Sequence, residues 1–136
     1  RGVFSEIHGS WSYPGPVTFM TGYLAFGLIR YHRLTGDAEV LALLCRLADG
    51  IVAETRVSPG RFRYSPLPEN NPRPAFRSHN TLLGGLCGYL ALTTRAPRYA
   101  AWARECYDAM LEPDDEPPTS MDMLQLAGWL LQAVAE

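Results

Sequence analysis

The sequence predicts an all-α protein in which antiparallel helical hairpins are arranged in two layers. Five segments have helical length and helical spacing of apolar residues. They alternate between segments that are apolar on every side and segments with a single apolar stripe. The links between them also alternate, being short after the first kind of segment and long after the second. Antiparallel packing then places all short links at one end, and the all-apolar segments form the inner layer.

Composition limits the classes of function. The chain has 136 residues with 47% hydrophobic content, enough for the core of one domain over residues 1–136, which can also be a piece of a larger protein. A net charge of −2 gives no electrostatic basis for binding nucleic acid or an anionic membrane. Three cysteines without framework spacing argue against a disulfide scaffold, and no signal peptide or membrane-spanning run is found. We therefore expect a cytoplasmic protein.

The first two helices form the clearest hairpin. Residues 1–16 are rich in Gly and Pro and are expected to be a loop. A helix over 17–34 leaves almost no polar face, and Gly36 is placed to end it as a C-terminal cap. Asp37 is a good N-cap for a second helix over 38–55, whose single apolar stripe is typical of a surface helix.

A long link and the most apolar helix follow. The link over 56–77 contains Pro59-Gly60 and then alternating basic and aromatic residues at 61–64, which predicts a short β-hairpin. The helix over 78–94 is apolar on every side and contains Gly84, Gly85 and Gly88. Because each interior Gly costs about 1 kcal/mol relative to Ala, we expect other helices to pack tightly against these three positions.

The last two helices repeat the alternation. The helix over 98–111 has apolar residues at i, i+3, i+4, i+7, i+8 and i+11 with charges opposite. An acidic, proline-rich link over 112–120 separates it from a helix over 121–135 that is again apolar nearly all round. The helices over 17–55 and 78–111 therefore form two consecutive hairpins.

This pattern resembles the (α/α) toroid proteins, in particular the six-hairpin glycosidase-like superfamily, which includes unsaturated glucuronyl hydrolases, β-L-arabinofuranosidase-type glycosidases and N-acylglucosamine 2-epimerase-like enzymes. The resemblance is carried by the inner helix over 22–33, the turn Leu34-Thr35-Gly36-Asp37, the outer helix that ends at Glu54, and the link GRFRYSP over 60–66. Only about two and a half of the six hairpins are present. Uncovered sides of the inner helices then predict self-association or packing against missing hairpins of the same chain.

The resemblance implies a sugar or another polar small molecule bound where the long links meet, without a cofactor. Aromatic rings can stack on the C–H faces of a sugar, arginine can pair with a uronic acid, and histidine or a carboxylate can transfer protons. The candidate catalytic residues are Glu6, His8 and His79, and the candidate substrate-binding residues are Trp11, Tyr13, Arg63, Tyr64, Arg77 and Asn80.

Two reactions remain open. Glycoside hydrolysis needs two carboxylates, for which the long links offer Glu6, Glu69 and the acidic residues 114–116. Epimerisation could use His8 and His79. Each residue also has a structural explanation: His79 and Asn80 can serve the first helical turn beside the N-cap Ser78, and Trp11 can fill the core.

The alternative function is a helical-repeat module that binds other proteins without catalysis. The long links are all expected at one end of the helices, and this asymmetry favours the toroid over the helical-repeat module. A terpenoid-cyclase type of toroid lacks support because no Asp-rich motif lies on a helix. No metal site is expected, since His79 and Cys87 would lie about 12 Å apart along one helix. The cysteines are expected in the core, and His32 on the surface at the short-link end, beside Arg30 and Arg33.

Overall fold

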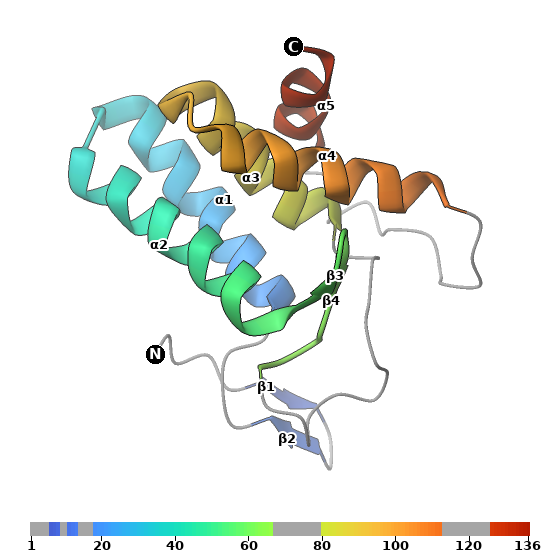
Figure 1. The fold of residues 1–136 in the computed structure, drawn as a ribbon. Coiled ribbons are helices and arrows are strands. Elements are labelled where there is room, and N and C mark those ends of the chain that lie inside the picture. The colour runs from blue at the N-terminus through green and yellow to red at the C-terminus, as the bar shows by residue number, and fades with distance from the viewer. Residues whose placement is uncertain (1–5, 9–10, 14–17, 67–79, 113–125) are drawn as a thin grey trace.

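The computed structural model describes residues 6–8, 11–13, 18–66, 80–112 and 126–136, and every structural statement below concerns these residues (Figure 1). They form five helices and two small antiparallel ribbons, so the predicted all-α class with a short β-hairpin in the 56–77 link is confirmed. The elements are β1 (Glu6–His8), β2 (Trp11–Tyr13), α1 (Thr18–Thr35), α2 (Ala38–Thr55), β3 (Arg56–Ser58), β4 (Arg61–Phe62), α3 (Asn80–Thr94), α4 (Pro97–Leu111) and α5 (Ala127–Ala135).

The α1–α2 turn follows the capping chemistry expected from the sequence. Gly36 has a φ of +67°, the left-handed conformation that glycine adopts without steric cost. The Asp37 side chain accepts hydrogen bonds from the backbone N–H groups of Glu39 at 2.8 Å and Val40 at 3.4 Å. These contacts satisfy two of the N–H groups that the first turn of a helix leaves without partners. Both predicted caps are confirmed.

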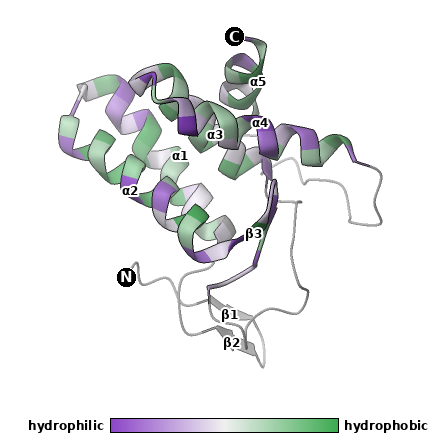
Figure 2. Ribbon diagram, viewed as in Figure 1, coloured by the Kyte–Doolittle hydropathy of each residue, from purple (hydrophilic) through white to green (hydrophobic). Residues whose placement is uncertain are grey.

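The helices form two layers. Helix α3 packs between α1 and α5, whereas α2 packs on α1 and α3, and α4 packs on α3 and α5. Each outer helix therefore covers the groove between two inner helices, and both lie on the same side in Figure 1. Figure 2 shows the same division, since α5 is mainly hydrophobic while α4 alternates between hydrophilic and hydrophobic residues. This is the predicted arrangement of antiparallel hairpins.

Helix α3 forms the centre of the core, with 12 of its 15 residues buried. Its glycines are the reason that α5 can approach so closely. A Cβ atom on Gly84 would lie 2.8 Å from Cys106 Cβ in α4. A Cβ atom on Gly85 or Gly88 would overlap backbone atoms of Leu126 and Trp129 respectively. Other helices pack tightly against all three positions, as predicted.

One expectation needs correction. Residues 1–16 are not entirely loop, because β1 and β2 pair within them. The sequence signal was Gly9-Ser10, a two-residue connection of the kind that joins hairpin strands, between segments rich in aromatic and β-branched residues. The inner helix α1 has an uncovered side, as was expected for an incomplete set of hairpins. Leu24, Tyr31 and Leu34 of α1 are 37%, 51% and 87% exposed.

Candidate functional site

Both β-ribbons lie at the end of the molecule where α1 and α3 begin (Figure 1). Hydrogen bonds connect the start of α1 to the residues after β4. The Thr18 backbone N–H donates to the Tyr64 carbonyl oxygen at 2.9 Å, and the Thr18 hydroxyl donates to the Arg63 carbonyl oxygen at 2.7 Å. Arg63 is exposed and Tyr64 is half-buried. These two predicted binding residues therefore stand at the start of an inner helix, where the sequence predicted the site.

The β1–β2 ribbon brings together four of the predicted site residues. Glu6 is paired with Tyr13, and His8 is paired with Trp11. Residues paired across two strands share a face, and so do residues two apart along a strand. All four therefore occupy one face of the ribbon, while the remaining pair, Ile7 and Ser12, occupies the other. Sequence reasoning selected these residues by type, and the register groups them.

Asn80 is placed in the packing at the start of α3. Its side chain is 1% exposed, and its amide nitrogen donates to the Gly60 carbonyl oxygen at 2.7 Å and the Cys106 carbonyl oxygen at 3.2 Å. Gly60 has a φ of +62°, and a Cβ atom there would overlap Ala109 and the Glu105 carbonyl oxygen. Asn80 thus fastens the β3–β4 turn to α3 and α4, which supports the structural explanation that the sequence left open.

Two ion pairs hold the same ribbon against α4. The Arg56 guanidinium contacts the Glu105 carboxylate at 2.9 Å, and Arg61 contacts Glu112 at 2.7 Å. Exposed pairs of this kind contribute little to stability. Their bonds nevertheless restrict how the ribbon can lie beside the start of α3. The predicted residues Arg77 and His79 lie outside the described residues, as do Ser78, Glu69 and the acidic residues 114–116.

One polar cluster at the other end of the inner helices was not predicted. His32 Nδ1 and the Tyr89 hydroxyl are hydrogen-bonded at 2.5 Å. The Tyr89 ring meets the Trp129 ring edge to face at 5.1 Å, and the Arg33 guanidinium lies 5.1 Å from the centre of the Trp129 ring. The cluster joins α1, α3 and α5, and its polar groups contact one another. We interpret it as a structural joint between the inner helices.

His32 is consequently half-buried and not the surface residue that the sequence suggested. The helical period contained the signal. His32 follows the buried residues Ala25 and Ile29 at i+7 and i+3, which places it on the core side of α1. Its charged neighbours Arg30 and Arg33 concealed that pattern.

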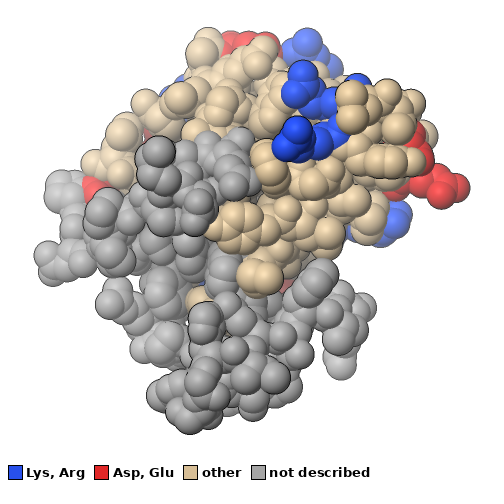
Figure 3. Space-filling model, turned by 180° about the vertical axis from the view of Figure 1, so that it is seen from behind, with Lys and Arg blue, Asp and Glu red and all other residues tan. Residues whose placement is uncertain are grey.

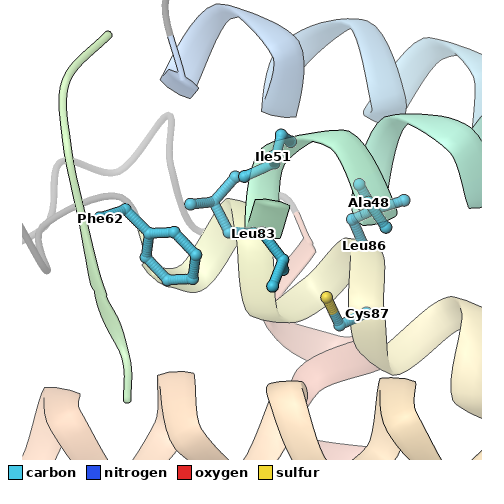
Figure 4. A pocket seen from close by; sticks show the side chains of 7 residues that line it. Ala48, Ile51, Phe62, Leu83, Leu86 and Cys87 are labelled. Carbon is cyan, nitrogen blue, oxygen red and sulfur yellow. The ribbon is translucent and has the colours of Figure 1, made fainter. Parts of the chain in front are cut away.

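A small apolar cavity lies between α2, α3 and β4 (Figure 4). Its volume is about 10 Å³, which is enough for roughly one water molecule. Among the lining side chains, only the Cys87 thiol could form a hydrogen bond with such a water. We therefore do not regard it as a ligand site. It is lined by Ala48, Ile51, Val52, Phe62, Leu83, Leu86 and Cys87.

The buried thiols offer no nucleophile. Burial raises the pKa of Cys87 to about 12, with smaller contributions from the charges of Asp49 and Glu105. Burial also raises the pKa of Cys106. Both groups are neutral thiols near pH 7, and the thiolate is the reactive form. In the part of the chain that the structure describes, no group of three or more His, Cys, Asp or Glu residues could hold a metal ion.

Comparisons with known proteins add no relationship. No family model, curated protein or solved structure matches this chain. Among the described helices, none combines the length and hydrophobicity needed to cross a membrane.

Proposed function

We propose that this chain handles carbohydrate, and that the face of the β1–β2 ribbon formed by Glu6, His8, Trp11 and Tyr13 contributes to recognition. The observation that carries the proposal is the strand register, which assigns two aromatic residues, an imidazole and a carboxylate to one face. The resemblance to carbohydrate-active toroids, together with the two-layer hairpins, indicates the ligand class.

The chemistry of this face suits a sugar. Aromatic residues such as Trp11 and Tyr13 bind the apolar C–H face of a pyranose, and the polar residues Glu6 and His8 hydrogen-bond to hydroxyl groups. Arg63, exposed at the start of α1, is a candidate partner for the carboxylate of a uronic acid.

The face supports binding more directly than hydrolysis. It contains one carboxylate, Glu6, whereas most glycoside hydrolases use two. Glycoside hydrolase-type or epimerase-type chemistry would therefore need a further acid or base, for which His79 and the acidic residues 114–116 remain sequence-based candidates.

The experiment is a thermal-shift titration of the 136-residue chain with monosaccharides, disaccharides, amino sugars and uronic acids. Binding to the native state stabilises it by about 2.7 kcal/mol when the ligand concentration is 100 times its Kd. We expect a concentration-dependent rise in Tm with at least one class of sugar. Trp11→Ala should abolish the rise, and Arg63→Gln should reduce it selectively for uronic acids.

Ser12→Ala is the matched control, because Ser12 lies on the same strand as Trp11 but on the opposite face of the ribbon. It should leave the rise in Tm unchanged. Equal losses in Trp11→Ala and Ser12→Ala would show that the ribbon acts structurally. A cooperatively melting chain with no shift for any sugar would contradict the proposal and favour the alternative, a helical-repeat module that binds proteins.

A further inference from the structure

The first two residues of α3, Asn80 and Thr81, carry buried polar atoms that form no hydrogen bond. Asn80 is 1% exposed and Thr81 is 2% exposed. Among the buried side chains that the structure describes, Asn80 Oδ1 and the Thr81 hydroxyl have no hydrogen-bond partner. Native proteins pair most of their buried polar groups, because an unpaired one destabilises the fold. Two such atoms in one helical turn therefore need an explanation.

The other buried threonines show that Thr81 is exceptional. Thr18 donates to the Arg63 carbonyl oxygen at 2.7 Å, and Thr55 donates to the Ile51 carbonyl oxygen at 2.7 Å. Valine has nearly the shape of threonine and no hydroxyl to bury, so packing alone does not require a threonine at position 81. A residue that lowers stability without a structural reason is typical of a binding site.

The orientation of the Asn80 side chain defines what its oxygen can bind. Its amide nitrogen donates to the carbonyl oxygens of Gly60 at 2.7 Å and Cys106 at 3.2 Å, so the nitrogen and Oδ1 cannot exchange places. Oδ1 can only accept, whereas the Thr81 hydroxyl can donate or accept. A carboxylate or a phosphate dianion has no proton for Oδ1. A hydroxyl group offers both a donor and an acceptor.

Both residues lie at the end of the molecule that holds the ribbons. Asn80 contacts the β3–β4 turn through Gly60. Thr81 lies one helical turn before Gly85, which faces the backbone of Leu126 at the start of α5. The N-terminus of a helix carries partial positive charge, which suits an oxygen atom. The start of α3 thus combines an acceptor, a hydroxyl and a field that attracts oxygen.

The ion pairs beside the β3–β4 turn compensate their own charges. Arg56 is paired with Glu105, and Arg61 is paired with Glu112. Viewed from behind (Figure 3), the described surface is mostly uncharged, with basic side chains gathered near its upper edge. The ribbons lie at the lower end of the molecule (Figure 1). Neither group of charges selects an ion over a neutral hydroxyl at the start of α3.

We propose that the first turn of α3 binds a hydroxyl group through Asn80 Oδ1 and the Thr81 hydroxyl. The bound hydroxyl donates its proton to Oδ1, and its oxygen accepts a hydrogen bond from Thr81. A sugar can supply this hydroxyl, and so can a single held water molecule, which is a common partner of buried polar groups. The sugar source rests on the proposed function and adds α3 to the recognition face of the β1–β2 ribbon. The water source is independent of that proposal.

The substitution Thr81→Val distinguishes the two sources in thermal melts with and without glucose, N-acetylglucosamine or glucuronate. If a sugar is the source, the unliganded variant should melt about 3 °C above the unchanged chain, because an unpaired buried hydroxyl is gone. It should also lose the sugar-induced rise in Tm. If a water is the source, the variant should melt about 3 °C lower and keep the sugar-induced rise, because the hydroxyl bonds to that water in the unliganded chain.

Two further variants serve as controls. Thr81→Ser keeps the hydroxyl and should retain the sugar-induced rise. Thr55→Val is the matched control, because Thr55 is also buried, at 4% exposure, but its hydroxyl has a partner. It should give no increase in the Tm of the unliganded chain and leave the sugar-induced rise unchanged.

Two results would overturn the inference. The first is an unchanged or higher Tm of unliganded Thr81→Val together with an intact sugar-induced rise. The second is an equal loss of the rise in Thr81→Val and Thr81→Ser, which would assign the effect to packing. Failure of the proposed function is recognised separately, since no sugar would then raise the Tm of the unchanged chain. In that case a lower Tm of unliganded Thr81→Val supports a held water, and an unchanged or higher Tm overturns the inference.

Discussion

Helices α1 and α3 look similar in sequence and differ in structure. Both are apolar on nearly every side and both contain internal glycines. Yet α3 is buried over 12 of its 15 residues, while α1 presents Leu24, Tyr31 and Leu34 to solvent. The difference lies in the neighbours. Helix α3 is packed by α1, α2, α4 and α5, whereas α1 packs mainly on α2 and α3. The hydrophobicity of a helix therefore limits how much of its surface can be buried. The number of neighbouring helices decides how much of that surface is buried.

The surroundings of the glycines show the same difference between covered and uncovered helix faces. Gly22, Gly85 and Gly88 face another helix so closely that a Cβ atom would overlap it. Gly27 lies on the same helix as Gly22 and faces open space. A helical glycine in a sequence thus marks either a helix contact or a free surface, and only the packing distinguishes them.

The largest expected effect comes from filling the contact between α3 and α5. Gly85→Ala and Gly88→Ala each place a methyl group on the backbone of α5, which a side-chain rotation cannot relieve. We expect each to lower the free energy of unfolding by about 3 kcal/mol, as overpacking of a core does. Urea denaturation of each variant measures this loss.

Gly27→Ala is the matched substitution in α1. It should raise the free energy of unfolding by about 0.5–1 kcal/mol, because alanine favours the helix and meets no neighbour. If Gly85→Ala and Gly27→Ala changed stability in the same direction, the distinction between the two helices would be wrong.

A smaller loss of folding stability is expected from a substitution at Asn80, where α3 begins. Asn80→Ala removes both donors to the buried carbonyl oxygens of Gly60 and Cys106. The Cys106 carbonyl oxygen lies within α4 and keeps its helical i+4 donor. Leaving the buried Gly60 carbonyl oxygen without the Asn80 amide costs about 2 kcal/mol, measurable by urea denaturation. Thr35→Ala is the comparison at the end of α1. Its exposed hydroxyl donates to the Tyr31 carbonyl oxygen and accepts from the Asp37 backbone N–H, and because water can replace both bonds the substitution should cost less than about 0.5 kcal/mol. Equal losses would contradict the structural role of Asn80.

A further and smaller effect than that of Asn80→Ala is a dependence on alkaline pH, which also follows from the burial of α3. The pKa of Cys87 is raised to about 12 in the folded chain, above its ordinary value of 9.0. From pH 9 upward the unfolded thiol loses its proton while the folded one keeps it, so stability falls as pH rises and is unaffected below pH 9. At pH 10 the loss from Cys87 is about 1 kcal/mol.

Denaturation at pH 7 and pH 10 tests this sign. Cys87→Ala lowers stability at both values by removing packing, but it should lose about 1 kcal/mol less than the unchanged chain between them. The neighbouring groups Cys106 and Tyr99, whose pKa values are also raised by burial, act in the same direction in both proteins. An identical fall in the two proteins would show that Cys87 is accessible to solvent.

The sequence predicted many residues of the candidate site from their chemical type, but it did not predict how they are arranged relative to one another. Trp11 and His8 stood out as aromatic and titratable residues in a polar link. Their pairing was missed because three-residue strands are too short for a period of two to be recognised, and only the hydrogen-bonded register assigns them to one face. Asn80 had two explanations in the sequence, and its buried contacts with Gly60 and Cys106 support the structural one.

The sequence by itself determined the five helices, the Gly36 and Asp37 caps, the β3–β4 hairpin and the alternation of inner and outer helices. These features depend on local propensity and on the period of apolar residues, which a chain carries without its neighbours. The tertiary structure alone decided that α5 packs on the glycines of α3, that His32 bonds to Tyr89, and that one side of α1 stays exposed. Those depend on contacts between residues far apart in the chain, which local pattern does not encode.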